Sequence, residues 1–294
     1  MTPRRPLDQM LLLYTDRSDP VSCVVLDNAA RFDYQVIAIS LYQLVHEVTI
    51  SPHWEWAGRS LDPTRTAVVN RLTFGTANTA NQLASPFQKQ QFWSWLHCEL
   101  QRFAYVSSMP TASSLIGCYG SLLDQWLDLP ELVGELRVPV HRTAWNEEVL
   151  HGDVYIVNPW NLYSLGRQIS AEPGTLRGAQ VAYVRPNGRL VHVSQVGSTI
   201  LVANAPQGMT PIQKDYIVSF GKSLASFSTS RILEHAFFVD VGNELPVFYS
   251  TCPVPVITGR HIVYADLVVE GLHDDIKGRS DRTASQAELL ELRE

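Results

Sequence analysis

The sequence predicts an α/β protein in which an N-terminal domain with a parallel sheet precedes central and C-terminal α+β subdomains. Three short runs, 10–15, 34–42 and 66–72, are mainly apolar and β-branched, as strands covered on both faces are. Farther along, apolar strands flank turn residues and predict antiparallel hairpins at 179–197 and 231–255. Parallel strands first and hairpins later indicate a parallel sheet followed by an antiparallel one.

Helical segments separate these strands. A proline at position 86 opens a helix whose apolar residues share one broad face, and 211–228 has the pattern of an amphipathic helix. A third helix is predicted over 117–136 and is expected to stop at Pro130, because proline lacks the amide hydrogen that a helix interior uses. Residues 260–272 are expected to be helical or extended.

We therefore divide the chain into four parts. They are an N-terminal α/β domain (1–110), a central subdomain (111–170), an antiparallel-sheet subdomain (171–272) and a charged tail (273–294). The tail begins without an apolar pattern but ends in helix-forming residues. It is expected either to be mobile or to dock as a terminal helix.

Composition excludes several functional classes. The chain has 294 residues, of which 45% are hydrophobic, and a formal net charge of −6, which argues against a nucleic-acid-binding surface. It has no apolar run long enough to span a membrane and no signal-peptide core, so we expect a cytoplasmic protein. The four cysteines lack the spacing of zinc ligands, and no metal site is expected from them. Serine-hydrolase, Rossmann and P-loop motifs are absent.

Three segments resemble stretches of one known superfamily. AVVNRLTF (67–74) resembles a strand that those proteins place before a long loop and helix, and 103–145 resembles the approach to their central unit. The strand pair in 231–255 resembles their closing metal-site hairpin. On these segments and on the order of elements over 10–272, the chain resembles the ATP-grasp superfamily, especially its glutathione-synthetase-like and RimK-type peptide-modifying ligases. The resemblance implies a pre-ATP-grasp domain, a central subdomain with a reduced lid and a grasp subdomain, with nucleotide held between the last two.

The chain departs from this family at the nucleotide and metal positions. Asn158 stands where the family has a lysine that contacts phosphates, and only 159–167 replace a longer Gly-rich lid. Tyr249 and Thr251 stand where the family has the glutamate and asparagine of its metal site. A phenol and a hydroxyl are poor ligands for Mg²⁺, and neutral asparagine does not offset phosphate charge. The resemblance thus implies a degenerate site, for which no cofactor is expected.

Two functions of different class follow. The first is a degenerate ATP-grasp-like protein that binds a peptide or small-molecule substrate, or serves as a scaffold beside a catalytic partner protein, in a peptide-modifying pathway. Fold analogy adds the expectation of a homodimer. The alternative is an active ATP-dependent carboxylate–amine or carboxylate–thiol ligase that uses ATP and Mg²⁺. In that case Arg177 would stabilise an acyl-phosphate and Asp240 would hold the metal.

Four further residues are candidates for substrate binding. Arg71 ends the strand in 67–74, and Arg185 and Arg189 lie on either side of the turn in 179–197. His192 alternates with two valines and therefore faces away from them. A solvated face remains open as the alternative for the arginines, and a structural role for His192.

Asp240 has an alternative to a catalytic role. It lies in an apolar context, where a carboxylate needs a partner. The turn at Gly242 and Asn243 could supply that partner through its backbone.

Overall fold

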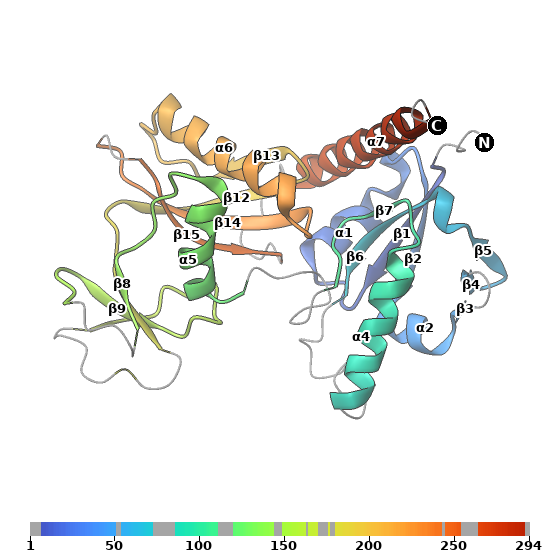
Figure 1. Cartoon of the computed structure of the whole chain (residues 1–294), viewed down its shortest axis with the longest axis horizontal. Helices are drawn as coiled ribbons and strands as arrows, with labels where there is room; N and C mark the ends of the chain where they lie inside the picture. Colours follow the sequence, from blue (N-terminus) through green and yellow to red (C-terminus); the bar gives the residue numbers. More distant parts are fainter. Residues whose placement is uncertain are drawn as a thin grey trace.

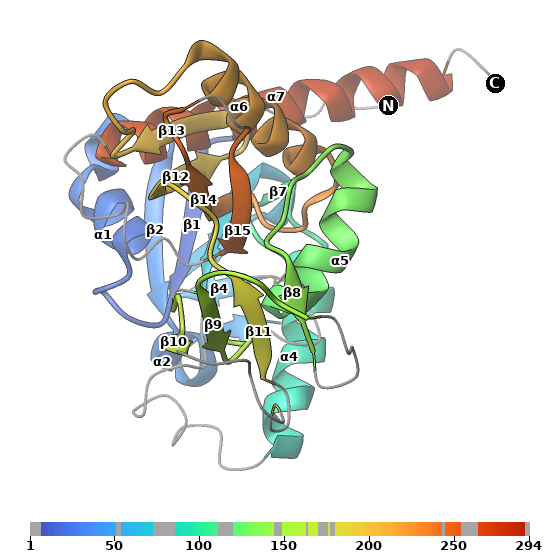
Figure 2. The ribbon, with the colours of Figure 1, turned by 90° about the vertical axis from the view of Figure 1, so that its left-hand side faces the viewer.

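The computed structural model describes residues 7–50, 54–72, 86–110, 120–143, 149–162, 164–169, 176, 180–242, 245–253 and 264–291. Figures 1 and 2 show an N-terminal unit around one sheet and, beside it, a second half built from two further sheets. Within this part of the chain, no helix is both long and apolar enough to cross a membrane.

The N-terminal sheet is parallel, as the apolar runs predicted. Its order is β2-β1-β6-β7, with every neighbouring pair parallel. Its strands are β1 (Gln9–Tyr14), β2 (Gln35–Ser40), β6 (Thr66–Arg71) and β7 (Tyr105–Val106).

Helices cover both faces of this sheet, which explains why its strands are apolar throughout. On one face lie α1 (Pro20–Asp27) and α7 (Tyr264–Glu291), whose apolar residues share a core with Met10 and Leu12. The other face packs, through Leu11 and Leu13, on two helices and a small antiparallel sheet. These are α2 (Leu41–His46), α4 (Pro86–Leu100), β3 (Thr49–Ile50), β4 (Trp54–Trp56) and β5 (Arg59–Leu61).

The second half contains two four-stranded sheets. The central sheet has the order β10-β9-β11-β8, and the C-terminal sheet has the order β13-β12-β14-β15. The central strands are β8 (His141–Arg142), β9 (Val154–Val157), β10 (Arg167–Ile169) and β11 (Val181–Val184). The C-terminal strands are β12 (Arg189–Val196), β13 (Thr199–Ala203), β14 (Ile232–Val239) and β15 (Val247–Cys252). Two helices, α5 (Leu122–Val133) and α6 (Pro211–Phe227), pack on this half.

The hairpin predicted at 179–197 is wrong. β11 pairs with β8 and β9, whereas β12 pairs with β13 and β14, so the two strands belong to different sheets. The turn residues connect the sheets instead. Gly188 has φ +99°, and a Cβ there would lie 2.3 Å from the Val239 carbonyl oxygen, so only glycine fits this crossing. Alternation of apolar residues predicts two strands correctly but does not tell which strands pair.

The expected stop at Pro130 is also wrong. α5 continues to Val133 and ends at Gly134, whose φ is +71°. The charged tail likewise begins inside a helix, because α7 runs without a break across position 272. Ile276 and Asp275 of this predicted tail are buried.

A buried ion pair joins α7 to the C-terminal sheet. Asp275 accepts from the Arg231 guanidinium at 2.9 Å and 2.5 Å, and it also accepts from the Tyr105 hydroxyl at 2.8 Å. Next to this pair the chain around Ser108 forms a β-bridge with Ser230, which links the N-terminal unit to the second half. The position of β14 relative to the parallel sheet therefore depends on Asp275.

We expect Asp275→Ala to lower the free energy of unfolding by about 3–5 kcal/mol, because it leaves the Arg231 charge buried without its carboxylate. Asp274→Ala is the matched control, since its side chain is 70% exposed, and it should change stability by less than ~0.5 kcal/mol. Urea denaturation of both variants measures the difference. Equal stabilities would show that Asp275 does not join the two parts.

Candidate functional site

The candidate site is the space between the central and C-terminal sheets, which we call the cleft. The face of the C-terminal sheet away from the cleft packs on α6, where Phe220 lies edge-on against Phe237 at a centroid separation of 5.4 Å. The opposite face carries Phe238, which packs edge-on against Tyr249 at 5.7 Å. Residues of both sheets share one hydrophobic cluster, so they meet across the cleft.

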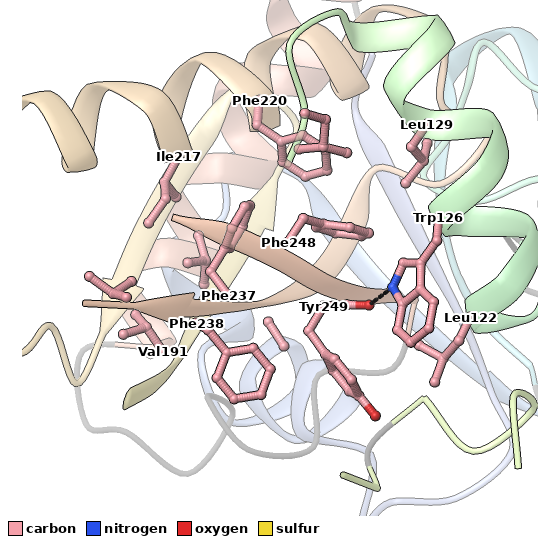
Figure 3. Packing of buried hydrophobic residues seen from close by; sticks show 14 of the residues in the cluster. Leu122, Trp126, Leu129, Val191, Ile217, Phe220, Phe237, Phe238, Phe248 and Tyr249 are labelled. Atoms are coloured by element: carbon pink, nitrogen blue, oxygen red, sulfur yellow. Dashed lines mark hydrogen bonds between the residues drawn. The ribbon is translucent and has the colours of Figure 1, made fainter. Parts of the chain in front are cut away.

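Aromatic rings from both sheets and from α5 fill the cleft, and Figure 3 shows Phe238, Tyr249 and Trp126 among them. The ring centroid of Tyr183 in the central sheet lies 5.7 Å from that of Tyr249 in β15 and 5.8 Å from that of Tyr155 in β9. The Trp126 ring of α5 packs against both, with ring-centroid separations of 5.6 Å from Tyr183 and 5.9 Å from Tyr249. Such ring pairs stabilise beyond the area that they bury. The two sheets are thus held face to face by this chain's own side chains.

Three hydroxyl groups fix the connection between β9 and β10 within the cleft. The Tyr183 hydroxyl donates to the Leu165 carbonyl at 2.7 Å, and the Tyr249 hydroxyl donates to the Ser164 carbonyl at 2.5 Å. The Ser250 hydroxyl donates to the Leu162 carbonyl at 2.9 Å. We call these three contacts the loop clamp. They supply donors to three carbonyl groups of a connection whose residues Leu162, Ser164 and Leu165 are half-buried.

Burial keeps both clamp phenols protonated. It raises the pKa of Tyr183 to about 12 and raises the pKa of Tyr249 still further from its ordinary value. Each phenol therefore remains a donor at any physiological pH.

A β-bulge decides which side chains of β15 reach the cleft. Ser250 pairs with Ala236 but the next pair is Phe248 with Phe237, so Tyr249 is the extra residue. The bulge brings Tyr249 and Ser250 to the same loop. Thr251 faces the other way, and its hydroxyl contacts His235. In a regular strand Tyr249 and Thr251 would share one face, and the bulge separates them.

α5 covers the open edge of β15. The Trp126 indole donates to the Tyr249 carbonyl at 2.7 Å. The Gln125 side chain accepts from the Thr251 amide at 2.7 Å and donates to its carbonyl at 3.0 Å. An edge strand usually exposes such groups to solvent or to other chains. Here they are satisfied, and the bulge that carries Tyr249 is held in place.

His235 is a structural residue beneath the cleft. Its Nδ1 accepts from the Thr251 hydroxyl and its Nε2 donates to the Gln195 side-chain oxygen, both at 2.6 Å. The Gln195 amide nitrogen is engaged with the Gly221 carbonyl, which leaves its oxygen as the acceptor. Burial lowers the pKa of His235 to about 3, so the imidazole stays neutral.

His192 reaches the cleft face, as its alternation with valines predicted. Its Nδ1 lies 3.4 Å from the Glu234 carboxylate of β14. The cavity beside this pair has a volume of about 10 Å³, which is at the lower limit for one water molecule. Whether His192 contacts a substrate stays a prediction.

Arg185 and Asp240 converge on a second, larger cavity of about 290 Å³, which we call the rim cavity. It lies beside the crossing between the two sheets, and Val138, Val140 and Leu245 contribute to its walls. The Asp240 carboxylate accepts from the Gly242 amide at 3.2 Å, which is the turn contact considered from the sequence. The structure thus brings together two of the predicted site residues.

The remaining predicted residues lie apart from the rim cavity. Arg71 is buried, pairs with Asp19 at 2.5 Å and donates to the Pro253 carbonyl at 2.8 Å. Burial alone would raise the pKa of Asp19, but the charge and hydrogen bonds of Arg71 and the hydrogen bonds of Ser22 outweigh it and lower that pKa. Arg71 therefore joins β6 to α1 and to the end of β15.

Arg189 is exposed at the start of β12, and Arg177 lies outside the described residues. Substrate binding by Arg71 or Arg189, and catalysis by Arg177, stay predictions. Among the residues that the structure describes, no group of three or more His, Cys, Asp or Glu side chains could hold a metal ion.

Sequence reasoning missed Glu234 and Tyr183. The acid next to His235 in ILEHAFFV was a signal, since a buried strand seldom contains a carboxylate without a function or a partner. Tyr183 gave no signal, because a tyrosine within a β-strand is ordinary.

No protein-family model and no curated protein matches this sequence. Three solved structures nevertheless match nearly all of it. The ATP-grasp ligase PsnB, solved with a minimal precursor, Mg and ADP, gives a TM-score of 0.63 at 15% identity over 94% of this chain and 99% of its own. The Chryseobacterium gregarium RiPP-associated ATP-grasp ligase, in complex with ADP and a leader and core peptide, gives a TM-score of 0.57 at 10% identity, over 93% of this chain and 97% of its own. The macrocyclase MdnC, bound with precursor peptide MdnA from Microcystis aeruginosa, gives a TM-score of 0.59 at 12% identity, over 90% of this chain and 99% of its own.

This chain has an ATP-grasp fold. With its parallel sheet and the two antiparallel sheets of its second half, the chain matches those neighbours over almost their full length. The ATP-grasp fold expected from the sequence is thereby confirmed. The division into domains at residues 110, 170 and 272 stays a prediction, although α7 spans the last of these positions.

We expect the loop clamp to contribute measurably to stability. Tyr249→Phe removes one hydroxyl donor and should cost about 1 kcal/mol, and adding Tyr183→Phe should cost at least as much again. Tyr42→Phe is the control, because Tyr42 is 53% exposed. Urea denaturation measures the loss, and limited proteolysis should detect a looser 158–166 segment in the double variant. If the double variant were as stable and as protease-resistant as Tyr42→Phe, the clamp would have no role.

His235 predicts a pH dependence of stability. Its folded pKa, about 3, is below the unfolded value near 6.5, so its contribution is complete above about pH 6.5. That contribution is lost as the pH falls toward 3, with a slope of up to ~1.4 kcal/mol per pH unit. His235→Gln should flatten the profile between pH 6 and pH 4 while lowering stability at pH 7. Parallel profiles for both proteins in denaturant titrations would contradict the assignment.

Proposed function

We propose that this chain is a peptide-binding or scaffold protein of a peptide-modifying pathway, with an ATP-grasp fold that no longer holds ATP and Mg²⁺ in the usual cleft. Its partners are a peptide or small-molecule substrate and a catalytic partner protein. The observation that carries the proposal is the loop clamp: β15 uses Tyr249 and Ser250 to hold the connection after β9 inside the cleft.

The composition of β15 supports the loss of a metal site in any alignment register. The strand VFYSTC contains no aspartate, glutamate or asparagine, and Mg²⁺ prefers such oxygen ligands. Moving the alignment by one or two residues therefore restores no ligand from this strand.

The distribution of lysine supports the loss of a phosphate grip in the same way. The chain has no lysine between Lys89 and Lys214, a stretch that spans the whole central sheet. Asn158, where the resemblance places a phosphate-binding lysine, is neutral. A triphosphate would therefore lose the lysine contact that the resemblance implies, and the cations that remain in or beside the central sheet are arginines, among them Arg142, Arg167 and Arg185.

The structural neighbours support a peptide as the ligand. PsnB, MdnC and the Chryseobacterium gregarium ligase were each solved with a precursor, leader or core peptide. A protein that keeps their fold and fills the cleft with its own residues retains surfaces on which a peptide could bind.

An active ligase is the second candidate function. It is favoured by the convergence of Arg185 and Asp240 on one cavity, which would place a cation and a carboxylate near a substrate. This function would require ATP and Mg²⁺ as cofactors, with Arg177 and Asp240 in the catalytic roles.

Thermal melting with and without millimolar ATP and Mg²⁺ separates the two functions. We expect no change in Tm, because the aromatic rings and the clamped loop occupy the cleft. A nucleotide present at 100 times its Kd would add about 2.7 kcal/mol of stability, which is several degrees of Tm.

An intact D-alanine–D-alanine ligase, melted in parallel, is the positive control. A stabilisation of this chain by ATP that needs Mg²⁺ and disappears in Asp240→Asn would contradict the proposal and favour the ligase. Direct calorimetric titration of ATP gives an independent reading of the same outcome.

A further inference from the structure

Three charged residues line the rim cavity: Arg137, whose guanidinium donates to the Leu245 carbonyl at 3.3 Å, Arg185 and Asp240. The last two have opposite charges and are not paired with each other. Arg185 and Asp240 both line it, and within the described part of the chain no ion pair joins either of them to any residue. Charges that lie partly out of solvent are usually paired. Two half-buried, unpaired charges of opposite sign in one cavity are therefore suited to a ligand that carries the complementary charges.

Arg185 is held in a fixed orientation. Its guanidinium lies 5.7 Å from the ring centroid of Tyr155 and 5.8 Å from that of Phe238, and it donates to the Tyr155 hydroxyl at 3.3 Å. Contact with two rings restrains the guanidinium, and among the described residues the Tyr155 hydroxyl is the one acceptor recorded for its five N–H donors. A planar, fixed guanidinium is suited to bind a carboxylate.

Asp240 lines the same cavity and has two hydrogen bonds of its own. Its backbone carbonyl accepts from the Gln213 side chain at 2.6 Å, and its carboxylate accepts from the Gly242 amide at 3.2 Å. One carboxylate accepts several hydrogen bonds, so Asp240 can also accept from an ammonium or amide nitrogen.

The walls and the size of the cavity limit the ligand further. Apart from the charged residues, the lining is mainly apolar and includes Val140, Val184, Phe238, Leu245 and Val247. The volume of about 290 Å³ is at the lower end of the range for ligand pockets, which corresponds to one or two amino-acid residues.

We infer that the rim cavity binds an apolar amino-acid residue through its carboxylate and its α-nitrogen. Arg185 binds the carboxylate, Asp240 accepts from the α-nitrogen, and the apolar walls cover the side chain. The residue is either a free amino acid or the C-terminal residue of a peptide, since both present these groups. The peptide source rests on the proposed function, whereas binding of a free amino acid does not.

Calorimetric titration of the full chain with leucine, N-acetyl-leucine and N-acetyl-leucinamide tests the inference. Leucine and N-acetyl-leucine should bind, and N-acetyl-leucinamide should not, because it lacks the carboxylate. The tripeptide Gly-Gly-Leu and its C-terminal amide distinguish the two sources. Tighter binding of the free-acid tripeptide than of leucine indicates a peptide C-terminus, and the reverse order indicates a free amino acid.

Two variants test the assigned contacts. Arg185→Gln should weaken leucine binding by roughly ten- to a hundredfold, since it removes the charged donors. Asp240→Asn should weaken leucine more than N-acetyl-leucine, because only leucine carries an ammonium group. Arg59→Gln is the control, since Arg59 is exposed and does not line the cavity.

A variant at an exposed position keeps the test decisive if Arg185→Gln or Asp240→Asn fails to fold. Val140 lines the cavity and is 56% exposed, so Val140→Asp should fold normally and still repel the carboxylate. The inference is overturned if no carboxylate probe binds at millimolar concentration, or if leucine binds equally to Arg185→Gln, Val140→Asp and the unchanged protein. These outcomes are independent of ATP binding, so they are distinguishable from a failure of the proposed function.

Discussion

The hydroxyl groups of β15 are the constraint on which the architecture of the cleft depends. A bulge turns Tyr249 and Ser250 toward the same loop, and both donate to its carbonyl groups. The bulge itself is supported from the edge by Trp126 and Gln125 and from beneath by the contact between Thr251 and His235. A strand that presents hydroxyl donors binds backbone carbonyls, whereas one that presents carboxylates would bind cations. The same position in the fold thus supports two different chemistries.

The energy of opening this cleft explains why a nucleotide would compete poorly with the chain's own residues. Each buried aromatic side chain removes roughly 150–250 Å² from water, so exposing Tyr183, Phe238 and Tyr249 would cost roughly 11–19 kcal/mol at about 25 cal/mol per Å². A ligand with micromolar affinity supplies only about 8 kcal/mol. The three clamp hydrogen bonds add about 1 kcal/mol each. The closed arrangement is therefore favoured unless a ligand binds without displacing the rings.

The sequence predicted the elements of this fold better than their pairing. The apolar runs at β1 and β6 could be recognised because helices cover both faces of their sheet. The partners of β11 and β12 could not, because alternation encodes which side chains face inward and not which strand lies alongside. For the site, residue type made Arg185, Asp240 and His192 candidates; the structure places the first two at the rim cavity and the third on the cleft face, and their roles stay predictions. The orientation of Thr251 was not, since a bulge is invisible in a pattern of period two.

The rim cavity differs from the cleft because a ligand can enter it without displacing the rings. Arg185 begins the crossing from β11 to β12, where Gly188 passes against the backbone of Val239 and Asp240. This close passage ties the position of Arg185 to that of the β14 end. Because the loop clamp and the aromatic rings hold the two sheets together, the separation of the charges is fixed before a ligand arrives. The side chains that line the rim cavity are thus ordered when the protein folds and not when a ligand binds. The entropy cost of binding is therefore lower, which favours binding of a small zwitterion at the rim.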